Sequence, residues 1–573
     1  MSIVSLSDGS SSSFTAEDLK DVAAQLNFEL PNGKDADDYL RLLWSFEAVM
    51  KQVEDGSDYI HPALKPQALS TSRSYWKPKP EDNPFNAWSH RCDLRAANPT
   101  SDILKGRTVA IKDNISVAAL PTTLGAPASL VSGDAVFPIS PIDAPVVSRL
   151  LAAGAVIKGT STCECFCASP LSFTSATGPV HNPRLHGYTA GGSSSGSCAL
   201  VAAHSLALEQ DDGSRSSWGE TVELAIGTDQ AGSVRTPAAF NGLYGLKPTF
   251  GLVPYTGGGS MSPMIDHLGP IASRLEDVAA LLEVMAGYDG LDPRMTPESP
   301  LMDQVKPYRQ LLSDFRQQVL ARPSDVGQGW KIGLLTESFL VPGVSPEVRD
   351  TVRDAARRFF EAAGATVVEI SVPLHSEGPV IWTASTRPSM SSWLCQGRPS
   401  GHLTYLPPHL KARWPPSQEM YEVLNSANPA LTNIILSERF AQRFLPAGDE
   451  AKAHRKVFEL RDAYDRALEE LDVLIAPCAP TVAMPHPETV DKEGRTPSVI
   501  ERLAPAIGLT SNTCPFNVTG HPSLNVPCGF SSRPERPDVR LPIGMQIIGK
   551  RWKDEEVIKA AALFERGREL ISS

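Results

Sequence analysis

The chain has 573 residues, enough to bury a large core, so we expect two or more lobes. Its hydrophobic content of 41% and charged content of 21% are typical of a soluble globular protein. The formal net charge of −12 argues against nucleic acid and anionic membranes as partners, because both would repel a negative surface.

Residues 1–14 are polar and hold few apolar side chains, so we expect this stretch to be disordered. It lacks the basic and apolar regions of a secretion signal, and no apolar run in the chain is long enough to span a bilayer. These features predict a cytoplasmic protein.

Residues 15–80 are predicted to form a helical segment. Thr15 is a suitable N-cap for a helix through about Leu26, and apolar residues recur at helical spacing from about Ala36 to Val53. This apolar stripe fits either core packing or a homodimer contact, and the sequence leaves the two open. A proline-rich linker follows over residues 76–84.

Residues 81–573 are expected to form an α/β domain. Strands over 108–111 and 155–158 flank a helix over 144–153, which predicts a mixed, mainly parallel sheet with helices on both faces. A further strand–helix–strand unit is expected over 331–370 and another strand at 473–476. Residues 375–450 hold many prolines and tryptophans and are expected to be irregular, apart from a helix near 431–444.

The nine cysteines are an odd number spread over a long chain, which argues against a disulfide framework. Cys163, Cys165 and Cys167 do not have the paired spacing of a zinc site, so we expect buried thiols that line a core or a pocket. We expect neither a metal nor a cofactor.

Two loops rich in Gly and Ser stand out, GGSSSGS at 191–197 and GTDQAGSVRTP at 227–237. Such loops can expose a serine hydroxyl beside backbone N–H groups, which is what a nucleophile and an oxyanion hole require. A phosphate-binding loop is excluded because no lysine follows the last glycine. Residues 208–221 lie between the two loops and are polar, which predicts a surface insertion that is either a decoration or a lid.

A third motif, GRTVAIKDNI at 106–115, places Lys112 at the end of an apolar strand. A lysine alone at such a position is most often solvated. Beside two Ser/Gly loops a different interpretation is favoured, because burial disfavours the charged form of a lysine and can turn it into a base.

These motifs resemble the amidase signature family. The resemblance rests on VAIKDNI (109–115), AGGSSSGS (190–197) and GTDQAGSVRTPAAFNGLYGLKPT (227–249), and it extends through TSATGPVHNP (174–183) and DHLGPI (266–271). Weaker motifs continue to LPIGMQIIG (541–549), so the likeness covers roughly residues 75–570. Residues 163–183 are similar to the amidases of bacterial nitrile-degradation pathways.

The resemblance implies a catalytic triad. Lys112 corresponds to the base, Ser193 to a bridging serine in a cis peptide, and Ser233 to the nucleophile that carries the acyl group. The oxyanion hole would be formed by backbone N–H groups of four consecutive residues, Gln230, Ala231, Gly232 and Ser233. Most relatives have glycine where this chain has Ala231, so a positive φ there would put the oxyanion hole in doubt. Asp229 and Arg235 are expected to form a structural ion pair.

The resemblance also places a variable region, about 300–450, over the acyl pocket. Cys167 matches a position near bound acyl groups in fatty acid amide hydrolase. We expect Cys167, Phe173 and Trp382 to bind substrate, with Trp393 and Trp414 as further candidates.

The expected activity is hydrolysis of a carboxamide to an acid and ammonia or an amine, through an acyl-enzyme on Ser233. Carbamates, anilides or esters fit the same chemistry, as in a urethanase or an aryl acylamidase. Two other interpretations are weaker: a Ser-His-Asp hydrolase that uses Asp266 and His267, and a catalytically inactive binding or scaffold protein. The expected partner is a small amide or carbamate, and a role as one component of a tRNA-dependent amidotransferase is less favoured.

Overall fold

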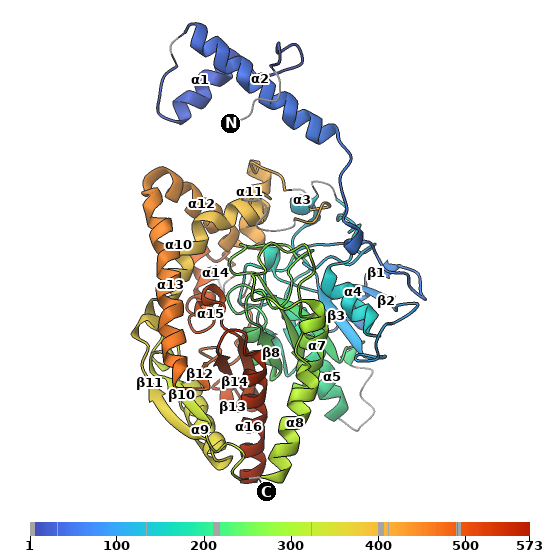
Figure 1. Ribbon diagram of the computed structural model, residues 1–573, viewed down its shortest axis with the longest axis vertical. Coiled ribbons are helices and arrows are strands. Elements are labelled where there is room, and N and C mark those ends of the chain that lie inside the picture. The colour runs from blue at the N-terminus through green and yellow to red at the C-terminus, as the bar shows by residue number, and fades with distance from the viewer. Residues whose placement is uncertain are drawn as a thin grey trace. The chain divides into compact units, whose positions relative to one another are not determined.

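The computed structural model describes residues 6–30, 32–132, 135–209, 218–322, 324–398, 406–410, 412–488, 490 and 494–572 (Figure 1). The chain divides into two compact units, Met1–Pro62 and Ala63–Ser573. Most of the insertion expected at 208–221 lies outside the described residues, so the choice between decoration and lid stays open. Within the described residues, no helix combines the length and apolar character needed to cross a membrane.

The N-terminal unit holds helices α1 (Ala16–Gln25) and α2 (Lys34–Asp55). Thr15 caps α1 as predicted, because its side chain accepts a hydrogen bond from the N–H of Asp18. We expected residues 1–14 to be disordered, but residues 6–14 contact α2. The N–H of Ser7 donates to Ser45 Oγ at 2.9 Å, and Trp44 Nε1 donates to the Phe14 carbonyl at 2.8 Å. Residues 1–5 lie outside the described residues.

The N-terminal unit ends before the boundary expected at residue 80. Residues 75–76 form strand β1, which pairs with β2 of the main sheet, so the chain after Pro62 belongs to the second unit. The expectation for this boundary placed too much of the chain in the helical segment, because a two-residue edge strand gives no periodic signal.

The second unit is built on one large sheet. The strands follow in spatial order: β1 (Tyr75–Trp76), β2 (Trp88–Leu94), β4 (Val156–Ser161), β3 (Thr108–Lys112), β7 (Leu224–Asp229), β9 (His267–Ala272), β8 (Tyr244–Lys247), β13 (Ser523–Arg533), β14 (Arg536–Gly549), β12 (Val473–Pro477), β10 (Lys331–Leu335) and β11 (Thr366–Ile370). A separate pair joins β5 (His181–Asn182) and β6 (Leu185–Thr189).

The α/β class with a mixed sheet is confirmed, but the expectation that parallel pairs dominate is wrong. Parallel pairing joins β3 to β4 and β7, and β10 to β11 and β12. The remaining neighbours in the sheet pair antiparallel, including the long hairpin of β13 and β14. The strand–helix–strand pattern was visible only at the two parallel groups, whereas the centre of the sheet is built from antiparallel strands that lack this signal.

Helices cover both faces of the sheet, as alternation along the strands requires. Val109 and Ile111 of β3 face a core formed with helices α4 (Pro145–Ala152), α7 (Leu275–Met285), α8 (Tyr308–Ala321), α9 (Pro346–Ala362) and α16 (Asp554–Ser572). Ala110, between them, faces α5 (Ser195–Glu209). Near the other end of the sheet, Leu474 and Ala476 of β12 face a second helical layer.

Part of that second layer occupies the region expected to be irregular. It contains α10 (Gly378–Met390), α11 (Gln418–Ala427), α12 (Pro429–Phe444) and α13 (Ala447–Glu469), which stand together in Figure 1. The expectation is wrong over α10 and α11, whereas α12 covers the helix expected near 431–444. Prolines predict irregular chain poorly here, because Pro379 and Pro429 lie at helix starts, where a missing N–H costs little. The remaining short helices are α3 (Ala128–Val131), α6 (Arg235–Asn241), α14 (Val499–Leu503) and α15 (Pro515–Thr519).

Candidate active site

Two parallel strands end side by side at the site. Strands β3 and β7 pair with Ile111 opposite Ile226, so their carboxyl ends meet at one edge of the sheet. Lys112, the last residue of β3, is fully buried there. Its Nζ donates to Thr228 Oγ1 of β7 at 2.7 Å, so the sheet itself fixes the position of the amine.

Ser193 lies in the loop that leads into α5. Lys112 Nζ donates to Ser193 Oγ at 2.7 Å, which joins two side chains that are both fully buried. The Gly192–Ser193 peptide is cis, as the resemblance implied. Gly191 has φ +73°, and a Cβ added there would lie 2.7 Å from Pro237 Cα, so only glycine fits this turn.

Ser233 lies in the loop from β7 to α6 and is 8% exposed. The N–H of Ser194 donates to the Ser233 carbonyl at 3.2 Å, which ties the two serine loops together. Gly232 has φ +133°, and a Cβ there would lie 2.4 Å from Thr513 Oγ1. A glycine is therefore required directly before Ser233. The Ser233 side chain itself lies in the wall of a cavity.

One of the four N–H groups expected in the oxyanion hole is already hydrogen-bonded within the loop. The N–H of Gly232 donates to Asp229 Oδ1 at 2.7 Å, so this donor is already engaged. In the described part of the chain no hydrogen bond engages the N–H groups of Gln230, Ala231 and Ser233. Ala231 does not have a positive φ, so the alanine fits without strain.

Side chains from the far end of the sequence hold this loop. Trp382 Nε1 of α10 donates to the Gln230 carbonyl at 3.1 Å. Thr513 Oγ1 donates to the Ala231 carbonyl at 2.5 Å. In a trans peptide the N–H points opposite the carbonyl, so these bonds also fix the directions of the Ala231 and Gly232 N–H groups.

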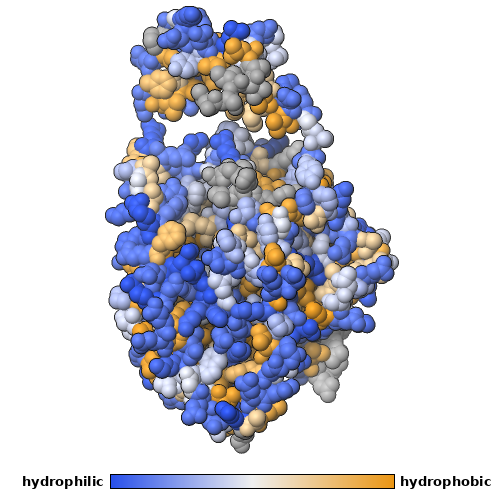
Figure 2. Space-filling view, in the orientation of Figure 1, coloured by the Kyte–Doolittle hydropathy of each residue, from blue (hydrophilic) through white to orange (hydrophobic). Residues whose placement is uncertain are grey.

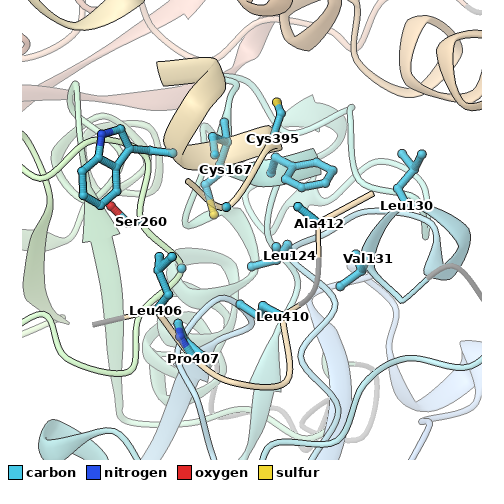
Figure 3. A pocket seen from close by; sticks show the side chains of 15 residues that line it. Leu124, Leu130, Val131, Cys167, Ser260, Cys395, Leu406, Pro407, Leu410 and Ala412 are labelled. Atoms are coloured by element: carbon cyan, nitrogen blue, oxygen red, sulfur yellow. The ribbon is translucent and has the colours of Figure 1, made fainter. Parts of the chain in front are cut away.

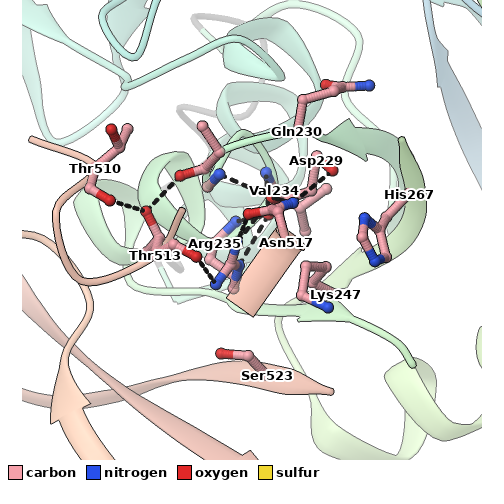
Figure 4. A network of polar contacts seen from close by, with 12 residues as sticks. Asp229, Gln230, Val234, Arg235, Lys247, His267, Thr510, Thr513, Asn517 and Ser523 are labelled. Carbon is pink, nitrogen blue, oxygen red and sulfur yellow. Dashed lines mark hydrogen bonds and ion pairs between the residues drawn. The ribbon is translucent and has the colours of Figure 1, made fainter. Parts of the chain in front are cut away.

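Asp229 and Arg235 form the expected ion pair, which is fully buried (Figure 4). Arg235 Nε and one terminal nitrogen donate to the two Asp229 oxygens at 2.9 and 2.8 Å, a bidentate contact. Asn517 Nδ2 also donates to Asp229 Oδ1 at 2.9 Å. Burial alone would raise the pKa of Asp229, but the charge of Arg235 and these hydrogen bonds bring it below its usual range.

Asp266 and His267 do not form a triad with Ser233. Asp266 accepts hydrogen bonds from Ser260 Oγ at 2.5 Å and from Arg294 at 3.1 Å. His267 Nδ1 lies 2.8 Å from the Ile265 carbonyl, and burial lowers the pKa of the imidazole far below its usual range. The interpretation as a Ser-His-Asp hydrolase is therefore wrong.

A cavity of about 270 Å³ opens beside Ser233. Two of the expected substrate-binding residues, Cys167 and Trp382, line it together with Gln230 and Ala231. Cys167 also lines a neighbouring cavity of about 70 Å³, whose other walls are mostly apolar (Figure 3).

Of the remaining residues expected at the pocket, some line a cavity and others do not. Trp393 lines the smaller cavity. Phe173 lines neither cavity and packs against the main core, and Trp414 also lies outside both. Cys163, Cys165 and Cys167 are buried free thiols, as the sequence predicted. A hydrogen bond from Cys163 lowers the pKa of the Cys167 thiol below its usual range.

Sequence reasoning missed several residues that position the site. Thr228 was detectable, because it lies next to the loop that carries Ser233, at the end of a strand parallel to β3. Thr513 and Asn517 follow about 280 residues later and give no local signal, because their role depends on the fold bringing them to Asp229 and Ala231.

Comparison with known proteins shows which family the chain belongs to. Residues 86–558 match the Amidase family. The chain belongs to this family. It is 34% identical over 498 residues to an enantioselective amidase of Rhodococcus rhodochrous, covering 86% of this chain and 85% of the relative. It is 32% identical to a glutamyl-tRNA(Gln) amidotransferase subunit from Methanosarcina mazei, covering 81% and 84%.

Solved structures show the same fold. A bacterial aryl acylamidase aligns with a TM-score of 0.61 at 24% identity, over 82% of this chain and 83% of its own. The peptide amidase of Stenotrophomonas maltophilia aligns with a TM-score of 0.58 at 26% identity, over 81% and 82%. This Amidase-family chain is therefore an enzyme that hydrolyses amide C–N bonds.

Proposed function

We propose that the enzyme hydrolyses carboxamides through an acyl-enzyme on Ser233. Ser233 Oγ forms a bond to the substrate carbonyl carbon while its proton passes to Ser193 Oγ, whose own proton passes to the Lys112 amine. The carbonyl oxygen gains negative charge and accepts hydrogen bonds from free N–H groups of the loop. The proton then returns through Ser193 to the leaving nitrogen, and water releases the acid by the same relay.

The observation that carries this proposal is the 2.7 Å hydrogen bond between Lys112 Nζ and Ser193 Oγ. A surface lysine would exchange this bond freely with water. Here both side chains are fully buried. The loop that carries Ser233 is held by a hydrogen bond from the N–H of Ser194, the residue after Ser193. The geometry supports a short proton path from the nucleophile to the amine, without a histidine.

A reactive-serine experiment tests the role of Ser233. A fluorophosphonate probe should label the wild-type protein at Ser233, and Ser233→Ala should not be labelled. Labelling of Ser233→Ala to the wild-type extent would place the nucleophile elsewhere. A folded wild-type protein that is never labelled would instead favour an inactive binding or scaffold protein.

The same chemistry extends to carbamates, anilides and esters, which would make the enzyme a urethanase or an aryl acylamidase. A hydrolysis screen over aliphatic amides, aromatic amides, anilides and ethyl carbamate separates these substrates. We propose carboxamides first, because the R. rhodochrous relative is an amidase. Higher kcat/KM for ethyl carbamate than for every amide would reverse this order.

We also propose that α2 makes a homodimer contact. Phe46, Met50 and Val53 recur at helical spacing on α2 and are 62%, 51% and 70% exposed, and Figure 2 shows apolar residues among hydrophilic ones on the N-terminal unit. Sedimentation should give a dimer for the full chain and a monomer for the Phe46→Glu, Met50→Glu double variant. A wild-type protein that stays monomeric at about 50 µM would contradict a stable contact of this kind.

A further inference from the structure

One charged side chain of the described residues lines the cavity at Ser233. Arg387 lies on α10, the helix that also carries Trp382, and lines the same cavity as Ser233 and Ala231. The other residues lining the cavity are neutral, and most are apolar. A guanidinium in such surroundings is expensive to bury, because charge is poorly solvated there.

Arg387 has no acidic partner among the described residues. No hydrogen bond or ion pair engages its guanidinium there, and its Nε is buried without a partner. Burial lowers the pKa of this arginine, and no neighbouring carboxylate opposes the effect.

The arginines of the described chain that are at most 7% exposed are Arg91, Arg235 and Arg294, and each is paired with a carboxylate. Arg235 donates to Asp229 at 2.8 Å, and Arg294 donates to Asp292 at 2.7 Å. Among the half-buried arginines, Arg149 and Arg461 donate to backbone carbonyls, and Arg184 lies over the ring of Phe530. Arg387 has no such contact among the described residues, and it lies at the cavity of the proposed nucleophile.

The position of Arg387 suits a ligand that enters from outside. Arg387 and Asn433 line the active-site cavity and also a neighbouring surface hollow between α10 and α12, so the two spaces meet at these residues. A ligand in the cavity can therefore reach the guanidinium and, beside it, the Asn433 amide. Both groups donate hydrogen bonds, and a carboxylate accepts them from the planar guanidinium in a bidentate geometry.

We propose that Arg387 recognises a carboxylate on the substrate, so that the preferred substrates are amides with a second, anionic end. The proposal rests on the proposed amidase function and deepens it. Two classes carry this chemistry: half-amides of dicarboxylic acids, with the carboxylate on the acyl side, and N-acyl amino acids, with the carboxylate on the amine side. The neutral remainder of the cavity accommodates the hydrocarbon between the two ends.

Matched substrate pairs test the proposal. Adipamic acid and hexanamide differ by one carboxylate on the acyl side, and 5-acetamidopentanoic acid and N-pentylacetamide differ similarly on the amine side. In one of the two pairs the wild-type kcat/KM should be at least about tenfold higher for the anionic member, the low end for a charged hydrogen-bonded contact. Succinamic, glutaramic and pimelamic acids, with shorter and longer homologues of the acetamido acid, extend the comparison to other separations.

Variants of Arg387 assign the preference to this side chain. Arg387→Met keeps most of the bulk and removes the charge, so the anionic-to-neutral ratio of kcat/KM should fall at least about tenfold, and Arg387→Lys should restore part of it. Arg358→Met, on the exposed face of α9, is the matched control and should keep the wild-type ratio. If Arg387→Met does not fold, Arg387→Gln provides the same comparison.

The outcomes separate the two proposals. Hydrolysis of the neutral amides with no anionic preference at any length, or a ratio unchanged in the folded Arg387 variants, would overturn carboxylate recognition and leave the amidase proposal standing. Failure of the wild-type protein to react with a fluorophosphonate would instead overturn the proposed function. Binding of adipamic acid to Ser233→Ala, lost on adding Arg387→Met, would support recognition independently of turnover.

Discussion

Lys112 Nζ donates a 2.7 Å hydrogen bond to Ser193 Oγ, and a second bond of equal length runs from the same amine to Thr228 Oγ1. The amine is therefore held between a strand and a loop, in a fully buried position. This arrangement depends on β3 and β7 being parallel neighbours, because only then do Lys112 and Thr228 lie at the same edge of the sheet.

Replacing the nucleophile should abolish activity. Ser233→Ala removes the atom that we propose attacks the carbonyl, and loss of an acting nucleophile costs far more than a factor of about a thousand in kcat. Steady-state hydrolysis of the best amide measures the effect, with thermal unfolding as the control for folding. Residual activity above about a thousandth of wild type would remove Ser233 from the nucleophile role.

Replacing the amine should be nearly as damaging. Lys112→Met fills the same space but cannot accept the proton from Ser193. Lys112→Arg cannot accept it either, because a guanidinium is already protonated. Both variants should lose at least about a hundredfold in kcat, the low end for losing a general base. Wild-type kcat in either variant, with the enzyme folded, would show that the relay does not pass through this residue.

The Trp382 hydrogen bond to the Gln230 carbonyl should matter for kcat. Trp382→Phe keeps an aromatic ring in the cavity wall but removes the Nε1 donor, so the loop carrying the oxyanion donors loses an anchor worth about 1 kcal/mol. We expect kcat to fall about fivefold for all amides alike. Trp330 packs against Phe315 and lines neither cavity, so Trp330→Phe is the control. An effect limited to bulky amides would instead indicate that Trp382 acts only by shape.

The buried pair of Asp229 and Arg235 should dominate local stability. Arg235→Met leaves the Asp229 carboxylate buried without its counter-charge, which costs about 3–5 kcal/mol. Thermal and denaturant unfolding should show a large loss, whereas Arg358→Met on the surface should show almost none. Wild-type stability of Arg235→Met would mean that Asn517 and the backbone donors satisfy Asp229 by themselves.

Glu164 should make stability depend on pH. Burial raises the pKa of its carboxyl to about 7 from a usual 4.5, despite hydrogen bonds from Thr174 and Ser195. The folded state therefore binds a proton that the unfolded state has already lost, so the contribution of Glu164 to stability is present below pH 4.5 and is lost as pH rises through about 7. The loss amounts to at most about 3 kcal/mol.

Glu164→Gln should flatten this dependence. The melting temperature of the wild type should fall between about pH 5 and pH 8 by more than that of Glu164→Gln, since the amide carries no titrating proton. Glu361→Gln, at an exposed position of α9, should keep the wild-type slope. Parallel pH profiles for wild type and Glu164→Gln would show that the carboxyl titrates alike in both states.

The sequence by itself determined the local features of this protein: the strand that ends at Lys112, the glycine-rich loops around Ser193 and Ser233, and the ends of several helices. These depend on near neighbours, on the φ that Gly232 must adopt and on caps such as Thr15. Only the tertiary structure decided the antiparallel centre of the sheet and the commitment of the Gly232 N–H to Asp229. It also decided the helical layer over the cavity. Arg387 looks like any surface arginine in the sequence. Only the tertiary structure places it between α10 and α12 at the cavity that Ser233 lines, because burial and pairing depend on segments that are distant along the chain.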